Sequence, residues 1–265
     1  MRAESCNCNF QAKEGGRLSA CLLMSKIPQI KEYGGLPVVT AEKMKYLDKK
    51  AVMEHGIPDH RLMENAGKAI AEETLRIAKE ELGKAPSELN AAVCSGRGNN
   101  GGDGLVAARC LQAAGTLVRV FILEPGEKGY GELVVRNIQK AKDAGVQIVL
   151  VTGENMESLA AEVTNADLLL DALLGVSAVG KPTGPVRRVI QLMNKSAKPI
   201  VAVDIPSGLS PDTGHHSGVF IIAKHTLTLG FAKSGLMAAH AQPNTGKIKV
   251  LDIGYPPELL EEAKK

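Results

Sequence analysis

The chain has 265 residues, of which 44% are apolar, and a formal net charge of +3. A chain of this length buries roughly three quarters of its unfolded surface, so it can form a core without disulfide bonds or a structural metal. The small net charge and the aromatic content of 3%, with no tryptophan, exclude an extended basic nucleic-acid surface and a row of base-stacking rings.

The N-terminal region is expected to contribute little to the fold. Residues 1–37 have the composition of a disordered or extended segment, weakly compatible with an organellar targeting peptide, and Met24 is an alternative start. No apolar run approaches the ~20 residues of a membrane span. The cysteines are odd in number and irregularly spaced, and a mobile terminus explains Cys6 and Cys8 better than a metal pair does. We therefore expect a soluble protein in the reducing cytoplasm, with one domain over residues 38–265.

Two helices are predicted first, and strands then alternate with helices. Thr40 is a plausible N-cap for a helix over residues 41–55, and Gly83 would end a second helix over residues 60–82. Further strands are predicted at 91–94, 117–123, 147–151, 167–170, 199–203, 225–229 and 247–252, and further helices at 102–114, 131–144, 157–164 and 185–195. The strands are continuous apolar runs, as in parallel sheets buried on both faces. This alternation predicts a Rossmann-like three-layer αβα sandwich with a mostly parallel central sheet.

The loop after the first of these alternating strands is rich in glycine. Residues 96–104 contain five glycines, and Gly96, Gly98 and Gly101 formally satisfy the G-x-G-x-x-G pattern. Such a loop lets a pyrophosphate approach the backbone at a helix N-terminus, although a tight strand-to-helix turn explains the glycines as well. Asp103 can be interpreted either as the N-cap of the following helix or as a direct ligand contact. We expect a dinucleotide-type ligand at this loop.

Carboxylates end two later strands. Asp171 closes an apolar strand, where a charge is costly unless a cation, a lysine or a backbone N–H pairs with it. Asp204 ends the next predicted strand and is followed by a turn containing Ser207. Such oxygen ligands suit an alkali or alkaline-earth cation rather than zinc. Two neighbouring carboxylates also suggest that one is held ionised and the other is available for proton transfer.

Other polar residues have simpler interpretations. Lys181 could reach a phosphate, but a solvated surface lysine is the safer interpretation, and His215 and His216 are expected at the surface of a polar loop. Neither a G-x-S-x-G elbow nor a G-x-x-x-x-G-K-[ST] loop occurs. A serine hydrolase and a P-loop NTPase are therefore not supported.

The longer pattern around the glycines resembles a known family. Residues 98–109, Gly-Asn-Asn-Gly-Gly-Asp-Gly-Leu-Val-Ala-Ala-Arg, resemble the YjeF N-terminal domain family, the NAD(P)H-hydrate epimerases. Residues 171–175, 203–208 and 63–67 carry further motifs of that family, in the right order. The resemblance covers about residues 38–256, and it is far more specific than G-x-G-x-x-G alone.

The resemblance implies an isomerase of metabolite repair. The family interconverts the R and S hydrates of NADH and NADPH and so supplies an S-specific dehydratase that uses ADP or ATP. It also implies a homodimer and a potassium ion held by Asn100, Asp171 and Ser207. The hydrate would contact Asn99, Asn100, Gly101, Gly102, Asp103, Gly175, Val176, Ser177, Ala178, Val179, Gly180, Lys181 and Asp204. Because the chain stops soon after Tyr255, we expect the stand-alone epimerase rather than a bifunctional enzyme.

The chemistry of that reaction suggests a role for one carboxylate. If the ring nitrogen expels the hydroxyl, a planar iminium forms, and water can return on the other face. A general acid/base beside the hydroxyl accelerates such a step. Asp204 is the predicted catalytic residue, whereas Asp171 is expected to stay ionised on the cation.

Two alternative functions are less well supported by the sequence. A non-catalytic nucleotide- or protein-binding module of the same fold should have lost its strand-end polar residues, yet they are present here. An ordinary NAD(P) dehydrogenase would need a catalytic His or Tyr-x-x-x-Lys, and Tyr-x-x-x-Lys does not occur. It would also need an acidic residue at the end of the second alternating strand, for which Glu124 is only a weak candidate.

Overall fold

The computed structural model describes residue 28 and residues 30–127, 129–216 and 218–265. The Cys6–Cys8 pair, the alternative start at Met24 and the predicted N-terminal extension up to residue 27 lie outside the described residues. None of the helices in the described ranges is both long enough and apolar enough to cross a membrane.

The described residues form a seven-stranded sheet in which every neighbouring pair is parallel. Its strand order is β10-β8-β7-β6-β3-β4-β5. The strands are β3 (Asn90–Ser95), β4 (Leu117–Leu123), β5 (Gln147–Val151), β6 (Leu168–Ala172), β7 (Ile200–Val203), β8 (His225–Leu229) and β10 (Lys247–Leu251). All residues of β6, β7 and β8 are buried, which confirms burial on both faces for the apolar runs of β6 and β7. Strand β5 at the edge of the sheet is largely exposed despite its apolar run, so the same expectation is wrong there.

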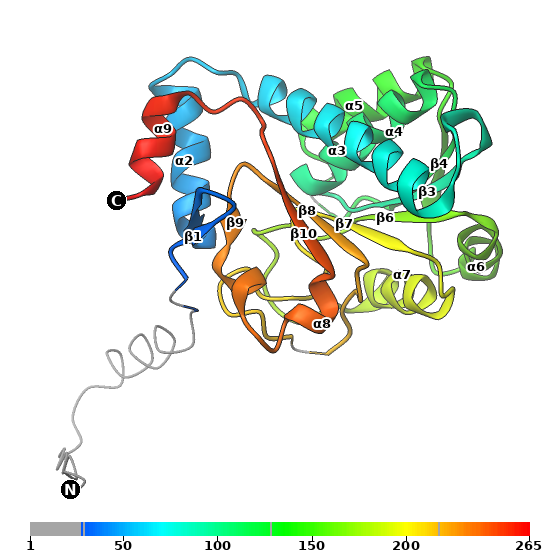
Figure 1. Cartoon of the computed structure of the whole chain (residues 1–265). Helices are drawn as coiled ribbons and strands as arrows, with labels where there is room; N and C mark the ends of the chain where they lie inside the picture. Colours follow the sequence, from blue (N-terminus) through cyan, green and yellow to red (C-terminus); the bar gives the residue numbers. More distant parts are fainter. Residues whose placement is uncertain (1–27, 29, 128, 217) are drawn as a thin grey trace, which may run out of the picture.

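Helices cover both faces of this sheet, which confirms the predicted αβα sandwich (Figure 1). On one side lie α3 (Asp59–Leu82), α4 (Asn99–Ala113) and α5 (Glu132–Asp143), and on the other lie α6 (Met156–Asn165) and α7 (Gly184–Lys195). Each side has its own apolar core. Leu105, Ile122 and Leu170 belong to the first core, whereas Phe121 and Met193 belong to the second.

The predicted start of regular structure near Val38 is too late. Two short strands, β1 (Glu32–Tyr33) and β2 (Leu36–Val39), precede α2 (Ala41–Met53). Strand β2 pairs with β9 (Ala232–Lys233), and these three strands make a second, small sheet. The Thr40 side chain accepts a hydrogen bond from the Lys43 N–H at 3.1 Å, which confirms the predicted N-cap of α2.

The end of the chain also folds against α2. Helix α9 (Pro257–Ala263) packs beside it, so segments from both ends of the described chain lie together (Figure 1). Three short elements complete the fold, η1 (Pro86–Glu88), η2 (Ser234–Met237) and α8 (Gln242–Thr245). The patterns in the sequence did not predict β1, β9, α8 or α9.

The strand order places one natural ligand position at the middle of the sheet. From β3 the chain moves outward to β4 and β5, and it then crosses back to β6 on the other side of β3. The loops after β3 and β6 therefore diverge, and they leave a crevice at the carboxyl ends of these strands. Ligands of open α/β sheets bind in such a crevice.

Close contact between α3 and α4 holds the wall of this crevice. A methyl group on Gly67 of α3 would lie 2.3 Å from the Cβ of Val106 in α4, which is closer than atoms can pack. Glycine here lets the two helices approach, at a cost in helix propensity.

We expect Gly67→Ala to lower the free energy of unfolding by about 1–3 kcal/mol, because the added methyl overpacks the helix contact. Gly153→Ala is the matched control, since a methyl at Gly153 meets open space. Urea unfolding of both variants measures the difference. Equal stability of the two variants would contradict the close contact.

Candidate active site

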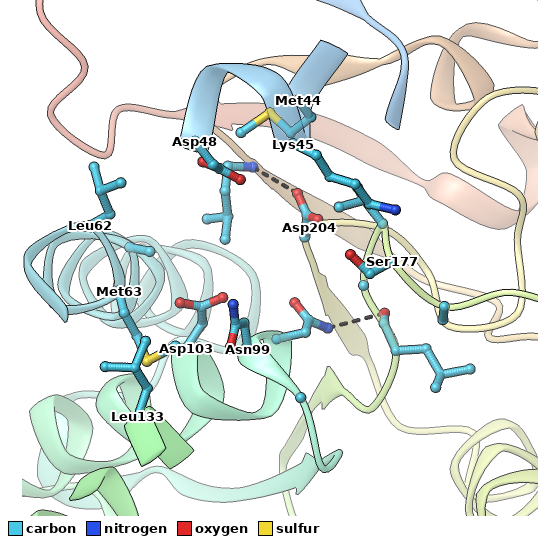
Figure 2. Close-up of a pocket in the computed structure, with 18 of the residues that line it drawn as sticks. Met44, Lys45, Asp48, Leu62, Met63, Asn99, Asp103, Leu133, Ser177 and Asp204 are labelled. Carbon is cyan, nitrogen blue, oxygen red and sulfur yellow. Dashed lines mark hydrogen bonds between the residues drawn. The ribbon is translucent and has the colours of Figure 1, made fainter. Parts of the chain in front are cut away.

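A cavity of about 630 Å³ lies at the crevice between the loops that follow β3 and β6. The chain after β7 and β8 also contributes to its wall, and α2, α3 and α4 close it from the side (Figure 2). One part of the wall is apolar, with Leu62, Met63 and Leu133. The rest carries the carboxyl groups of Asp48, Asp103 and Asp204, so the cavity joins an apolar surface to a concentrated group of acids.

Asp204 is held in a strained backbone conformation at the end of β7. Its φ angle is +68°, a left-handed value that non-glycine residues rarely adopt. Its Oδ1 accepts hydrogen bonds from the ammonium of Lys233 and, at 3.3 Å, from the Leu229 N–H. Within the described part of the chain, nothing donates a hydrogen bond to Oδ2. Strain of this kind is typical of functional positions, and here it fixes one oxygen while the other stays available.

Lys233 is a site residue that the sequence motifs did not predict. Its side chain is completely buried, and its Nζ donates to Asp204, to Leu229 O at 2.8 Å and to Thr228 Oγ1 at 3.2 Å. A buried lysine needs such partners because its charge is costly to remove from water. The sequence carried a signal, since this lysine ends the apolar run of residues 229–233. The cost argument that singled out Asp171 applies to this lysine equally.

Asp103 faces the cavity from α4, and its interpretation as an N-cap is wrong. Helix α4 begins at Asn99 rather than at residue 102, so Asp103 lies beyond its first turn. Burial raises the pKa of the Asp103 carboxyl well above its usual range, and the charges of Asp204 and Asp48 raise it further. Figure 2 shows Asp103 and Asn99 on one side of the cavity, with Asp204 and Asp48 across from them.

Asp48 brings a third carboxyl group from α2. The Tyr255 hydroxyl donates a hydrogen bond to its Oδ1. Burial raises the pKa of Asp48, although the tyrosine hydrogen bond and the charge of Lys233 act in the opposite direction. The cavity thus holds three carboxyl groups, of which only Asp204 is hydrogen-bonded to the buried ammonium of Lys233.

Behind the cavity wall, oxygen atoms from three loops gather around Asp171. Its Oδ1 accepts hydrogen bonds from Ser207 Oγ at 2.6 Å and from Leu173 N–H at 3.2 Å, and its Oδ2 accepts one from Ser207 N–H at 2.8 Å. Burial nevertheless raises the pKa of Asp171 to about 6. The sequence predicted that this carboxylate needs partners, and backbone and hydroxyl donors supply them.

Asn100 connects this cluster to the loop after β6. Its Nδ2 donates to Leu174 O at 3.1 Å, and Ser207 Oγ accepts a hydrogen bond from Leu174 N–H at 2.9 Å. The Asn100 Oδ1 is buried, and it has no hydrogen-bond partner among the described residues. An orphaned buried oxygen on a side chain linked through Leu174 to Ser207 and Asp171 fits a hard cation such as potassium.

Most glycines of the loop at residues 96–104 serve internal packing. A methyl on Gly96 would lie 1.9 Å from Leu173 O, and one on Gly101 would lie 2.1 Å from Gly96 O. A methyl on Gly102 or Gly104 would instead meet the side chain of Met63 or Ala172, whereas Gly98 alone of the five faces open space. Close backbone contacts thus explain Gly96 and Gly101, and packing of α4 against neighbouring side chains explains Gly102 and Gly104.

The structure brings most of the predicted substrate contacts together. The first cavity is lined by Asn99, Asn100, Asp103, Gly175, Val176, Ser177, Ala178 and Asp204. Val179 and Gly180 line a neighbouring cavity instead. Gly101, Gly102 and Lys181 line neither cavity. The aliphatic part of Lys181 packs against Gly218.

The chain has close relatives of known name. A family model described as YjeF-related protein N-terminus matches residues 59–235. An NAD(P)H-hydrate epimerase from Elusimicrobium minutum is 37% identical over 227 residues, which cover 86% of this chain and 100% of that protein. A bifunctional NAD(P)H-hydrate repair enzyme Nnr from Thermofilum pendens is 36% identical over 229 residues, but this match spans only 42% of that longer protein. The crystal structure of the yeast protein ynu0 has a TM-score of 0.74 and 27% identity, covering 86% of this chain and 93% of that one.

Fold and site together define a Rossmann-like α/β enzyme with an acid-lined cavity at the switch point of its sheet. The chain belongs to the YjeF N-terminal family, as its motifs predicted. Helix α2, which supplies Asp48 to the cavity, precedes the range matched by the family model.

The Asp204–Lys233 pair gives a prediction about stability. Lys233→Met should cost about 3–5 kcal/mol of unfolding free energy, because it leaves a buried carboxylate without its cation. The double variant Lys233→Met/Asp204→Asn should cost clearly less than the sum of the two single changes. Chemical denaturation of the wild type, the two single variants and the double variant measures the four free energies of unfolding for this double-mutant cycle. Additive costs would show that the pair is not coupled.

Proposed function

We propose that this protein interconverts the R and S hydrates of NADH and NADPH at the hydrated carbon of the nicotinamide ring. The observation that carries the proposal is the placement of Asp204, braced by Lys233, in a cavity whose opposite side holds Asp103. The relatives named as NAD(P)H-hydrate epimerases support the same reaction. The apolar wall suits the uncharged ring of the substrate.

The reaction requires one bond to break and reform. The ring nitrogen donates its electron pair to the neighbouring carbon, the carbon–oxygen bond breaks, and a proton joins the departing hydroxide to give water. Water then adds to the opposite face of the planar iminium and loses a proton, so no redox change occurs. The protein must supply and remove these protons at the hydroxyl, and general acid/base groups do this efficiently.

Asp204 and Asp103 suit the two proton transfers. Asp204 is ion-paired with Lys233 through Oδ1, and its Oδ2 is available to accept a proton from water. The raised pKa of Asp103 favours a protonated carboxyl, which can donate to the leaving hydroxyl. Two carboxyl groups with different environments can in this way divide acid and base roles. Lys233 acts as a positioning residue, because its fully buried ammonium holds Oδ1 of Asp204 in place.

The alternative of a non-catalytic binding module gains no support. Its hallmark would be the loss of polar side chains at the strand ends, whereas Asn100, Asp103 and Asp204 all line the cavity. The dehydrogenase interpretation is also unsupported, since Glu124, its candidate for the ribose contact, lines neither cavity.

Asp204→Asn should lower kcat at least 10²-fold with little change in KM, because it removes the proton acceptor but keeps the shape. The assay starts from mixed R and S NADH hydrates, removes the S form with an S-specific dehydratase, and follows recovery of NADH absorbance from the R form. Asp143→Asn, at the end of α5, is the matched control.

A wild-type rate equal to spontaneous epimerisation would refute the proposed activity. Full activity of Asp204→Asn, with the wild-type thermal transition, would instead refute only the role of Asp204.

We also propose a potassium site formed by Asn100, Asp171 and Ser207. It is supported by the orphaned Asn100 Oδ1 and by the oxygen ligands around it. When bound, the cation would supply positive charge beside the Asp171 carboxylate and hold the loops after β3, β6 and β7 together. These residues would thereby keep the cavity wall in place rather than take part in proton transfer.

Potassium chloride should raise the melting temperature of the wild-type protein above its value in choline chloride of equal ionic strength, because a ligand that binds only the folded state stabilises it. Asn100→Ala should lose most of this difference. Differential scanning calorimetry measures it without any assay of activity. Identical melting temperatures of the wild type in the two salts would contradict the site.

Three further statements stay predictions, two from the family resemblance and one, the location, from the cysteine pattern. A homodimer is expected and can be checked by sedimentation velocity. The S hydrate would pass to a separate dehydratase, which the bifunctional relatives support because their name joins repair activities in one chain. A cytoplasmic location is the third.

A further inference from the structure

A second cavity adjoins the first on the far side of the loop after β6. Its volume is about 530 Å³, and it lies between the start of α2 and the loops that follow β6 and β7. The two cavities share part of their lining, namely Lys45, Leu174, Gly175, Val176 and Ala178. They therefore meet across this loop, and one elongated ligand can occupy both.

A dinucleotide whose nicotinamide end lies beside Asp204 can extend from there in more than one direction. The usual direction in dinucleotide-binding folds is toward the end of the neighbouring strand, here β4. Arg97 and Leu123 line the first cavity at that strand end, where the Arg97 guanidinium donates to the Glu124 carbonyl. The glycine loop beside Arg97 is packed against its own backbone. A second direction leads over the loop after β6, whose residues line both cavities, into the second cavity.

The lining of the second cavity suits an adenosine group. The His216 ring lies 3.9 Å from the Phe220 ring, tilted by 31°, so that the phenyl group supports the imidazole at the cavity wall. A supported flat ring of this kind is a stacking surface for a base. Glu42 and Asp212 place carboxylates in the same wall, where they can accept hydrogen bonds from ribose hydroxyls.

The shared wall also carries a cation at the right place. Lys45 of α2 lines both cavities, and Figure 2 shows its side chain next to Ser177, near Asp204. The pyrophosphate of a dinucleotide lies between its two nucleosides, so a ligand that spans both cavities places this group at their junction. A lysine there offers a charge that attracts phosphate.

We propose that the second cavity binds the adenosine half of the hydrated dinucleotide, with the base stacked on His216 and the pyrophosphate beside Lys45. This inference rests on the proposed function, because it starts from the nicotinamide end lying in the first cavity. It assigns a binding role to His216, which the sequence placed at the surface without a ligand.

The test compares two substrates, the R hydrate of NADH and the R hydrate of reduced nicotinamide mononucleotide, which lacks adenosine. His216→Ala should raise KM for the NADH hydrate about tenfold, as expected for a lost base–aromatic stack. Its kcat/KM for the mononucleotide hydrate should match the wild-type value. His60→Ala is the matched control, because His60 is exposed and lines neither cavity.

Adenosine provides a second, independent measurement. It should compete with the NADH hydrate but not with the mononucleotide hydrate, and calorimetry should detect its binding to the wild type and a tenfold or greater loss in His216→Ala. Equal effects of His216→Ala on both substrates, or no effect on either, would overturn the inference. If the wild type epimerises neither hydrate, the proposed function fails, and adenosine calorimetry alone then decides whether the second cavity binds adenosine.

Discussion

The buried ion pair between Lys233 and Asp204 is the interaction on which the site depends. Two charges removed from water are costly unless their geometry is well matched, and here the carboxylate, a hydroxyl and a carbonyl all accept hydrogen bonds from one ammonium. Lys233 lies in β9, whose register with β2 pairs it directly with Val39. The small sheet near the chain start therefore positions a lysine almost two hundred residues away in sequence, and that lysine positions the reacting carboxylate.

Most of the sheet could be predicted because its strands are apolar runs between clear helix signals, and several predicted strand ranges match the structure to the residue, as for residues 117–123 and 147–151. The positions of Asp171 and Asp204 near the ends of β6 and β7 followed from the same pattern. Lys233 could not be placed, because β9 has two residues and its pairing with β2 leaves no local periodicity. Asp48 lies in a predicted helix, but no local pattern directs that helix to the cavity. Of the two interpretations of Asp103, the N-cap is wrong, because it assumed a helix start three residues later than the start of α4 in the structure.

The glycine-rich loop shows how one pattern can have two physical causes. Glycines are required both where a phosphate touches the backbone and where two backbones touch each other. In this loop the second cause dominates, since Gly96 and Gly101 meet carbonyl groups of their own chain. The loop thereby joins the ends of β3 and β6 tightly, and binding chemistry passes to the side chains of Asn99, Asn100 and Asp103 around it.

The contact between α2 and the last residues of the chain also orders events during synthesis. Asp48 bonds to Tyr255, and the hydroxyl of Tyr46 in the same helix donates to Glu262 at 3.3 Å. A ribosome-bound chain that has produced Asp204 and Lys233 still lacks the residues that fasten α2 across the cavity. The strands up to β8 can therefore pair before α2 is fastened, but the acid-lined cavity closes only after Tyr255 and Glu262 have been added.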